Sequence, residues 1–400
     1  MTITKNNSVG NTTCRSRRTL CLGAMCFVVA LVLALVLAEI SLRARQYVKY
    51  GTGRVPGWLH MGEGPIADWH PFLRTVPKAP ADWLEVQGNN SAVISINSLG
   101  FRSPAISLKK PSGTFRVACV GGSAVYDTRV SMDQTWAVQL QDALQKCFPD
   151  RVFEVVNAGI PSRTTADTIV NLALRVLPID PDVVIVMHGI NDQKPNRYPG
   201  FKDDYSHWYP PPVRAYVNFW HRIIDRSLLG SHIRYRLLFV LNPARKDNWR
   251  GEKLKRYDTV EKAGLNAYRR NIESIIGMCR IHGVEVVIAT VGHSLKENAD
   301  WNPGMGTRNP LVYYHECLTF QGIENAFMEY NRINREVAAE QGCVLVDIER
   351  LLPEGKEHYQ DDVHFNSKGS RLVAELFARE VPWKEWIRGR KPQMNADGRG

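Results

Sequence analysis

Two short segments carry the residue types of a nucleophile and of a base that could activate it. Gly121-Gly122-Ser123 follows an apolar run, and a serine on such a tight turn is exposed enough to attack a carbonyl carbon. Far along the chain lies Asp361-Asp362-Val363-His364. A histidine three residues after an aspartate can accept the serine proton while the carboxylate fixes the histidine tautomer. Taken singly, each segment also fits an ordinary loop.

Two further segments could supply hydrogen-bond donors to a developing oxyanion. Gly159, in Asn157-Ala158-Gly159, would offer a backbone N–H that no side chain obstructs. Asn191, in Gly189-Ile190-Asn191-Asp192, would offer its side-chain amide, and the backbone N–H of Ser123 would be a third donor. Each segment alone is also compatible with a simple turn at the end of a strand.

Other residues compete for the acid–base roles. His188 and His358 are alternative bases, but His188 lies within or directly after an apolar run and His358 lacks the Asp-x-x-His relation. Asp362 competes as the carboxylate that orients the histidine, and the spacing favours Asp361. Asp192 is expected to support its loop rather than to act in catalysis.

Apolar periodicity predicts the elements that would bring these segments together. Five runs fit buried strands: Phe115–Val120, Val152–Asn157, Val183–Met187, Val284–Val291 and Val344–Ile348. Helical patterns fill the intervals, over Trp136–Phe148, Thr164–Leu177, a segment ending at Arg280, Gly322–Gln341 and Ser367–Phe377. Strands that alternate with helices predict a doubly wound α/β sandwich, in which catalytic residues follow the carboxyl ends of the strands.

The order Ser, Gly, Asn and then Asp-x-x-His resembles the SGNH (GDSL) hydrolase family. Ser123, Gly159, Asn191 and His364 match the four residues for which that family is named, and Asp361 matches the acid of its triad. The resemblance covers residues 115 to 380. It implies a flavodoxin-like three-layer α/β/α sandwich with a five-stranded, mostly parallel sheet. It also implies a serine ester hydrolase that needs no metal or organic cofactor.

Two features indicate a subgroup within that family. Gly122 stands where the commonest form of the first motif has Asp, which distinguishes this chain from the typical lipases. A lead-in like that of many membrane-anchored members is present as His70-Pro71-Phe72-Leu73-Arg74 and Asn97-Ser98-Leu99-Gly100-Phe101-Arg102.

An apolar stretch near the N-terminus predicts a membrane helix. Leu20 to Ala38 carries no charged residue, and at 1.5 Å per residue it spans about 28 Å, close to the hydrocarbon thickness of a bilayer. Arg15, Arg17 and Arg18 precede it, and no convincing A-x-A-like cleavage site follows. The prediction is therefore an uncleaved signal anchor, with a cleaved signal peptide and a buried core helix as alternatives. We expect a single-pass protein of the cell or inner membrane whose catalytic domain is extracytoplasmic.

These patterns divide the chain into five parts: a short basic tail (1–19), a transmembrane signal-anchor helix (20–42), a stalk and irregular lead-in (43–114), a hydrolase domain (115–385) with an aromatic-rich insertion at about 195–256, and a flexible C-terminal tail (386–400).

The net charge and the cysteine pattern indicate which partners and ligands are not expected. The net charge is +11, but the basic residues are scattered without a run of five or six, so nucleic acid is not an expected partner. The eight cysteines include no CxxC pair, which argues against a structural zinc site. Buried free thiols are expected, with one disulfide as the alternative.

The expected reaction is hydrolysis of a carboxylic ester. Three substrate classes fit a membrane location: O-acetyl groups of cell-surface glycans, lipid esters, and small esters or thioesters. An O-acyltransferase acting on a surface polysaccharide would use the same triad. Two further alternatives are a metal-dependent phosphoesterase using His188, Asp192, His358 and His364, and a non-catalytic binding module. The aromatic insertion is expected either to line the substrate site or to form a packed cap.

Overall fold

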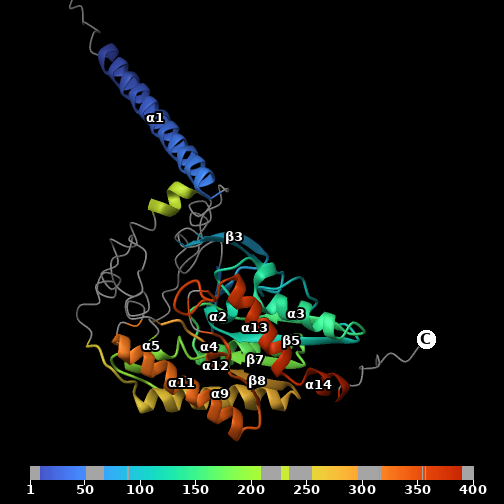
Figure 1. Ribbon diagram of the computed structural model, residues 1–400. Coiled ribbons are helices and arrows are strands. Elements are labelled where there is room, and N and C mark those ends of the chain that lie inside the picture. Colours follow the sequence, from blue (N-terminus) through green and yellow to red (C-terminus); the bar gives the residue numbers. More distant parts are fainter. Residues whose placement is uncertain are drawn as a thin grey trace, which may run out of the picture.

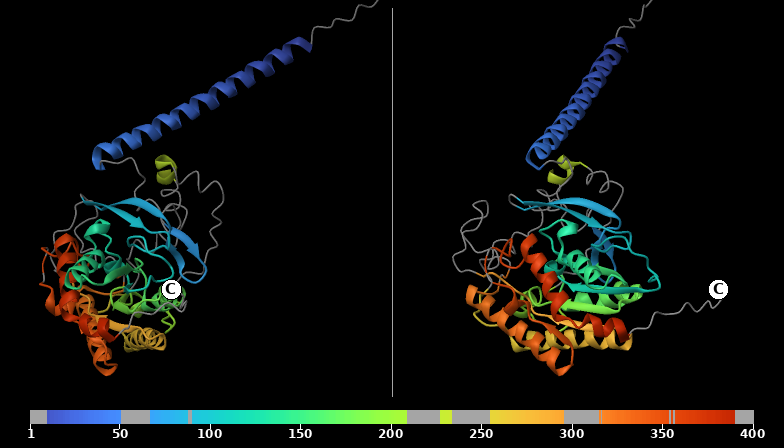
Figure 2. Two further views of the ribbon diagram at one scale, coloured as in Figure 1. Left: turned by 90° about the vertical axis from the view of Figure 1, so that its right-hand side faces the viewer. Right: turned by 45° about the vertical axis from the view of Figure 1, so that its right-hand side comes forward.

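One long helix projects from an α/β body. The structure is a computed structural model and describes residues 10–50, 67–87, 90–208, 227–233, 255–295, 315, 317–353, 355 and 357–389. Helix α1 (Gly10–Tyr50) extends away from the body in every view (Figures 1 and 2). The most apolar 18 residues within its segment Leu22–Val48 have a mean hydropathy of 2.7, and none of them is buried. The 27 residues would span about 40 Å, so this helix is long and apolar enough to cross a membrane, as a signal sequence also can be.

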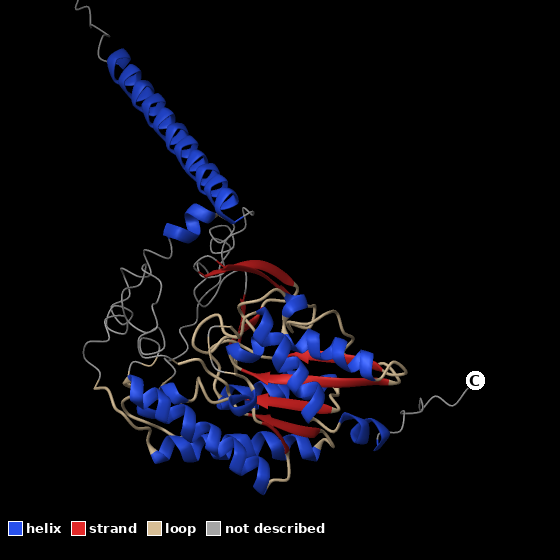
Figure 3. Cartoon of the chain, viewed as in Figure 1, coloured by secondary structure: helices blue, strands red, loops and turns tan. Residues whose placement is uncertain are grey.

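A five-stranded parallel sheet forms the centre of the body (Figure 3). Its strands are β5 (Thr114–Gly121), β6 (Val152–Asn157), β7 (Val183–Met187), β8 (Glu285–Ala289) and β9 (Val344–Val346). Their order across the sheet is β6-β5-β7-β8-β9, and every neighbouring pair is parallel. This is the flavodoxin-like order, and it confirms the predicted fold class and all five predicted strands.

The chain direction across the sheet decides which face each helix covers. From β5 to β6 the chain moves one way, and from β6 to β7, β8 and β9 it moves the other way. Right-handed crossovers therefore place α3 (Trp136–Cys147) on one face and α4 (Thr165–Asn171), α9 (Lys262–Ile281) and α11 (Phe320–Glu340) on the opposite face. Helix α13 (Ser367–Glu380) lies beside α3 (Figure 1). The rings of Trp136 in α3 and Phe377 in α13 stack with their centres 5.1 Å apart. The remaining helical segments are short: α2 (Ser123–Tyr126), η2 (Met132–Gln134), η3 (Leu172–Val176), η4 (Leu177–Ile179), α5 (Gln193–Arg197), α12 (Ile348–Leu351) and α14 (Trp383–Gly389).

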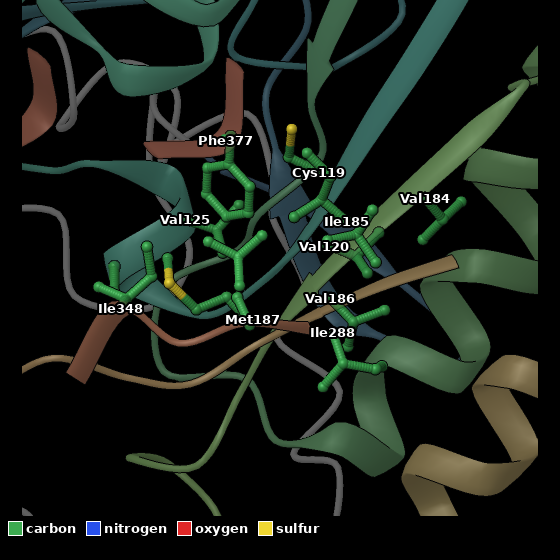
Figure 4. Packing of buried hydrophobic residues seen from close by; sticks show 14 of the residues in the cluster. Cys119, Val120, Val125, Val184, Ile185, Val186, Met187, Ile288, Ile348 and Phe377 are labelled. Atoms are coloured by element: carbon green, nitrogen blue, oxygen red, sulfur yellow. The ribbon is translucent and has the colours of Figure 1, made fainter. Parts of the chain in front are cut away.

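The core lies between the sheet and its two helical layers. Strand residues such as Val120, Ile185 and Val186 are buried on both faces of the sheet, as their continuous β-branched pattern predicts. Figure 4 shows Phe377 and Val125 beside these strand residues, on the side of α13. In the described part of the chain, six cysteines are free thiols: Cys26, Cys119, Cys147, Cys279, Cys317 and Cys343.

The predicted lead-in contains two antiparallel strand pairs. β1 (Ala67–His70) pairs with β2 (Arg74–Pro77), and β3 (Ala81–Gln87) pairs with β4 (Asn90–Ile96). The chain then turns at Asn97, whose side-chain oxygen accepts the N–H groups of Leu99 and Phe101. This turn delivers Arg102 into the body, where it is 1% exposed. The lead-in is thus packed against the hydrolase domain at Arg102.

Candidate active site

Ser123 begins α2 directly after β5, at the carboxyl edge of the sheet. Neighbouring backbone and side chains leave no room for side chains on the two residues before it. A Cβ on Gly121 would collide with the Met187 carbonyl oxygen, and one on Gly122 would collide with the Asn191 amide nitrogen. The Gly-Gly pair therefore allows the β5 turn to approach the end of β7 closely.

Ser123, His364 and Asp361 form a continuous hydrogen-bonded line. His364 Nε2 lies 2.8 Å from Ser123 Oγ, and His364 Nδ1 lies 2.9 and 2.8 Å from the two carboxylate oxygens of Asp361. The backbone N–H groups of Val363 and His364 also donate to Asp361 Oδ1, at 3.0 and 2.9 Å. The Asp-x-x-His turn thus holds its own carboxylate against the imidazole, which leaves the far ring nitrogen facing the serine hydroxyl.

Arg129 adds a cation to this line, and no sequence pattern had marked it. Its Nη2 donates to Asp361 Oδ2 at 2.6 Å, and the two side chains are 11% and 19% exposed. Burial alone would raise the pKa of Asp361. The charge and hydrogen bond of His364, then Arg129 and the Val363 N–H, outweigh that effect and hold this pKa well below its usual range. Asp361 is therefore ionised throughout the neutral and mildly acid range.

The second and third segments meet next to Ser123. Asn191 Nδ2 donates to the carbonyl oxygen of Arg163 at 2.9 Å, and that carbonyl lies near Gly122. The Gly159 N–H donates to Asn157 Oδ1 at 3.1 Å, and a Cβ on Gly159 would stand 2.6 Å from the Tyr126 nitrogen. Gly159 therefore permits a close approach to α2, and its N–H already has an acceptor.

Ser162 occupies an unusual backbone conformation in the same turn. Its φ is +60°, in the left-handed region that is uncommon for residues other than glycine. The turn runs alongside the nucleophile, because the Ile160 N–H donates to the Gly121 carbonyl at 3.0 Å and Asn191 binds the Arg163 carbonyl. Because this conformation is strained for serine, we infer that the orientation of the Ser162 backbone, and not its side chain, is what the turn requires.

A buried polar cluster supports the loop behind Ser123. Arg102 donates to the carbonyl oxygens of Tyr126, Asp127 and Val130. Asp127 Oδ2 accepts the Trp136 N–H at 3.0 Å and the Ser370 hydroxyl at 2.8 Å. Burial raises the pKa of Asp127 to about 6, against the opposing effects of Arg102 and these two hydrogen bonds. The cluster ties the nucleophile loop to both α3 and α13.

The competing residues lie in supporting positions. Asp192 is fully buried and accepts the N–H of Thr165 at 3.0 Å and its hydroxyl at 2.5 Å. Burial raises the pKa of Asp192 to about 7 and lowers that of His188 to about 3. His188 Nε2 contacts Thr168 Oγ1 at 2.7 Å. Within the described residues, no group of three or more His, Cys, Asp or Glu side chains is arranged so that it could hold a metal ion.

A small pocket opens beside the nucleophile. It is a cavity of about 10 Å³, enough for roughly one water-sized group. Its lining comes from the turns after β5, β7 and β8: Gly122, Ser123, Ala124, Met187, His188, Gly189, Ile190, Asn191 and Val291. The lining thus combines Ser123 and Asn191 with apolar side chains such as Met187, Ile190 and Val291.

The first part of the aromatic insertion, residues 195–208, is described and includes several of its aromatic side chains. The rings of Tyr198 and Trp208 meet edge to face at 4.9 Å, and Lys194 Nζ lies 5.0 Å from the centre of the Trp208 ring. A second small cavity is lined by Gln193, Lys194, Tyr198, Trp208, His315, Cys317 and Leu318. Phe201 and Tyr205 also lie in the described part, with ring centres 6.5 Å apart. Four further aromatic residues of the insertion, Tyr209, Tyr216, Phe219 and Trp220, lie outside the described residues.

Comparison with known proteins gives one family match and several structural ones. The model of the GDSL-like lipase/acylhydrolase family matches residues 119–372, which is more than half of the chain. Among solved structures, Axe2, an acetylxylan esterase from Geobacillus stearothermophilus, is similar at 17% identity, with 69% of this chain and 97% of Axe2 covered and a TM-score of 0.39. LAE5, an α/β-hydrolase enzyme from the metagenome of Lake Arreo in Spain, is similar at 16% identity, with 66% and 93% covered and a TM-score of 0.38. No curated protein matched the chain.

Proposed function

Since the chain belongs to the GDSL-like lipase/acylhydrolase family and is therefore an ester hydrolase, we propose that Ser123, His364 and Asp361 are its catalytic triad and that its substrates are short-chain, acetyl-type esters. The observation that carries the triad is the unbroken line of contacts from Ser123 Oγ through His364 to Asp361. Nucleophile, base and orienting acid are each within hydrogen-bond distance of the next, which is the geometry that acyl transfer by a serine requires.

The reaction proceeds in two halves. His364 Nε2 takes the Ser123 proton as Oγ bonds to the ester carbonyl carbon, and the carbonyl oxygen becomes an oxyanion. The tetrahedral intermediate collapses with loss of the alcohol, which receives the proton from His364, and the acyl group stays on Ser123. Water then gives a proton to His364 as its oxygen attacks the acyl carbon, and His364 returns this proton to Ser123 Oγ as the carboxylic acid leaves. Asp361 stabilises the imidazolium in both halves and keeps Nε2 toward the serine.

Three donors are proposed for the oxyanion hole: the Ser123 N–H, the Asn191 amide, and a backbone N–H of the turn after β6. For that last donor the sequence pointed to Gly159, whose N–H would first have to leave Asn157 Oδ1. Ser162 is a second candidate in the same turn, since its positive φ re-orients the backbone there. In either case Gly159 is needed, because a larger residue would push the turn away from α2.

A small acyl group fits the pocket beside Ser123. When the carbonyl oxygen lies among the oxyanion donors and the carbonyl carbon lies at Ser123 Oγ, the remaining acyl substituent must occupy a space that borders both groups. The pocket lined by Met187, Ile190 and Val291 borders both Ser123 and Asn191, and about 10 Å³ accommodates a methyl group rather than a chain. This supports an acetyl ester over a long-chain lipid ester. O-acetyl groups of a cell-surface glycan are the substrate class that we propose.

The proposed location is the outer side of a membrane that α1 crosses. The arginines before the apolar segment favour a cytoplasmic N-terminal tail. A piece of the insertion also reaches the other end of α1. Glu39 accepts hydrogen bonds from the Ser227 hydroxyl at 2.8 Å and from the N–H groups of Leu228 and Leu229 at 2.9 and 2.8 Å. The catalytic domain would therefore lie close to the bilayer, within reach of acylated surface glycans.

The decisive experiment uses the full chain in detergent. Hydrolysis of p-nitrophenyl acetate, butyrate and octanoate is measured for the wild type and for Ser123→Ala and His364→Ala, with Ser274→Ala and His282→Ala as controls on exposed positions of α9 and its C-cap. We expect both site variants to lose at least 10³-fold in kcat and the controls to keep wild-type rates. Equal turnover by the wild type and both site variants would falsify the triad.

The same preparation separates hydrolysis from transfer. Acetate release from an acetylated oligosaccharide is followed with and without an unacetylated acceptor glycan. Free acetate as the product supports the hydrolase, whereas acetylation of the acceptor at the expense of free acetate would identify an O-acyltransferase that uses the same triad.

A further inference from the structure

Arg129 contacts the candidate triad from outside its motifs. It lies in the loop after α2, and its Nη2 donates to Asp361 Oδ2 at 2.6 Å. The other two guanidinium nitrogens, Nε and Nη1, are buried and have no hydrogen-bond partner among the described residues. Two unused donors on a buried guanidinium cost free energy of folding. Among the described residues, the ion pair with Asp361 is the contact that offsets this cost.

The fold holds Arg129 in place from both sides. Arg102, which is 1% exposed, donates hydrogen bonds to the carbonyl oxygens of Tyr126 and Asp127, which precede Arg129, and of Val130, which follows it. The Asp127 side chain is in turn fixed by Trp136 and Ser370. The backbone that carries Arg129 therefore has little freedom to move away from Asp361.

The charges around His364 mean that the Arg129–Asp361 contact affects the protonation of the imidazole. Three charged or titratable side chains face the imidazole or act on it: Asp361 at Nδ1, Arg129 behind Asp361, and Asp127, on whose pKa His364 acts through its charge. The Asp361 carboxylate stabilises the protonated imidazole, and a guanidinium on the same carboxylate opposes that stabilisation.

We propose that Arg129 is a positioning residue that holds the Asp361 carboxylate against His364 Nδ1 and, through its own charge, opposes protonation of the imidazole. The proposal rests on the triad assigned above and adds a regulator of its pH range. Asp361 still fixes the tautomer through its two oxygens, while Arg129 limits how strongly its negative charge favours the imidazolium.

The test is the pH dependence of kcat/KM for p-nitrophenyl acetate in Arg129→Gln and Arg129→Lys, measured on the full chain. Glutamine can keep a hydrogen bond to Asp361 but removes the charge, whereas lysine keeps the charge at nearly the same place. We expect the acidic limb of the Gln variant to move up by about one pH unit, because a charge within about 4–6 Å of a titrating group has an effect of that order. The Lys variant should keep the wild-type limb even if its kcat falls.

Two control variants separate the effect from general damage. Arg269→Gln removes an arginine that bonds to Glu336 and Glu340 on the outer helices, and its acidic limb should match the wild type. Asp127→Asn tests whether the limb belongs to that buried carboxylate instead. A lower kcat with an unmoved limb in Arg129→Gln, or the same limb shift in Arg269→Gln, overturns the proposal while leaving the triad intact. An inactive wild type overturns the triad, and this proposal with it.

Discussion

Replacing Asp361 by Asn tests the chemistry of the triad with almost no change in shape. The Asn oxygen can take the place of Oδ1 and still accept the N–H groups of Val363 and His364. The Asn NH2 group must then face His364 Nδ1 and Arg129 Nη2, which are both donors to Oδ2 in the wild type. His364 Nδ1 also lies 2.9 Å from Oδ1, but that oxygen already accepts two backbone N–H groups. The imidazole can accept a hydrogen bond from the Asn NH2 group only as the tautomer with its proton on Nε2, and we expect this tautomer to be favoured.

That tautomer cannot accept the serine proton, and the expected loss follows from it. His364 Nε2 would donate to Ser123 Oγ, across the 2.8 Å contact, instead of receiving from it. In Ser-His-Asp enzymes this substitution lowers kcat by about 10⁴-fold while the overall geometry persists. We expect a fall of that order for acetyl ester hydrolysis, with KM changed much less.

Stability should fall as well, for a separate reason. Arg129 is 11% exposed and would lose its only anionic partner among the described residues. Breaking a largely buried, charge-assisted pair on one side costs about 2–3 kcal/mol. Because the pKa of Asp361 is depressed in the folded state, its contribution is complete above the unfolded value of about 3.9 and is lost as the pH falls below it. The gap in unfolding free energy between wild type and variant should therefore shrink in acid.

A double variant separates the two effects. Asp361→Asn combined with Arg129→Gln removes the stranded cation, so urea unfolding should show a recovery of stability without a recovery of kcat. Asp362→Asn, at the neighbouring carboxylate, serves as the matched control and should hydrolyse the acetyl ester at a near-normal rate. If Asp361→Asn keeps more than a tenth of the wild-type kcat, the orienting role assigned to Asp361 is wrong.

The remaining predictions address the rest of the site. Asn191→Ala should lower kcat by about 10²–10³-fold through loss of one oxyanion donor, and an unchanged steady-state rate would remove Asn191 from the oxyanion hole. Val291→Ala should enlarge the acyl pocket, so that the ratio of butyrate to acetate hydrolysis rises several-fold over wild type; a constant ratio would place the acyl group elsewhere. Gly159→Ala should lower the unfolding free energy by about 1–3 kcal/mol, since its methyl group would overpack against the Tyr126 nitrogen, and a wild-type denaturation midpoint would contradict this. Arg102→Met should destabilise the fold by about 3 kcal/mol, because three carbonyl groups lose the guanidinium as a donor; full stability would show that water replaces the guanidinium.

The sheet was predictable because its residues are buried on both faces. Val183–Met187 is a run of five buried apolar residues, and only a central parallel strand or a buried helix segment produces such a run. The glycine and asparagine turns that follow the runs then indicated where each strand ends. The predicted strands differ from the observed ones at their ends, most at Val284–Val291, where β8 is Glu285–Ala289. Its flanking residues are just as apolar, so composition could not mark the boundary.

The residues that support the site were not predictable from motifs. Arg129 acts through one ion pair, and neither the spacing nor the composition around it differs from that of a surface loop. Arg102 ends a lead-in motif, but its contacts with three carbonyl groups are not visible in the sequence. The engagement of the Gly159 N–H by Asn157 is also invisible in the sequence, since it depends on the path of the backbone after β6. The strand pairs within residues 67–96 were missed because their short runs lack sustained alternation. These features arise only when distant segments meet.

The distance between Ser123 and His364 is set by packing far from the sheet edge. The two residues are 241 positions apart, and the loop of His364 leads directly into α13. Helix α13 is held against α3 by the stacking of Trp136 and Phe377. Ser370, in the first turn of α13, also donates a hydrogen bond to Asp127 in the loop that follows Ser123. Gly369 also lets the helix approach the His358 backbone, which braces the other side of the same loop. The 2.8 Å contact at the reacting groups is therefore a consequence of how α13 packs on α3, and substitutions in that interface should change kcat before they change the fold.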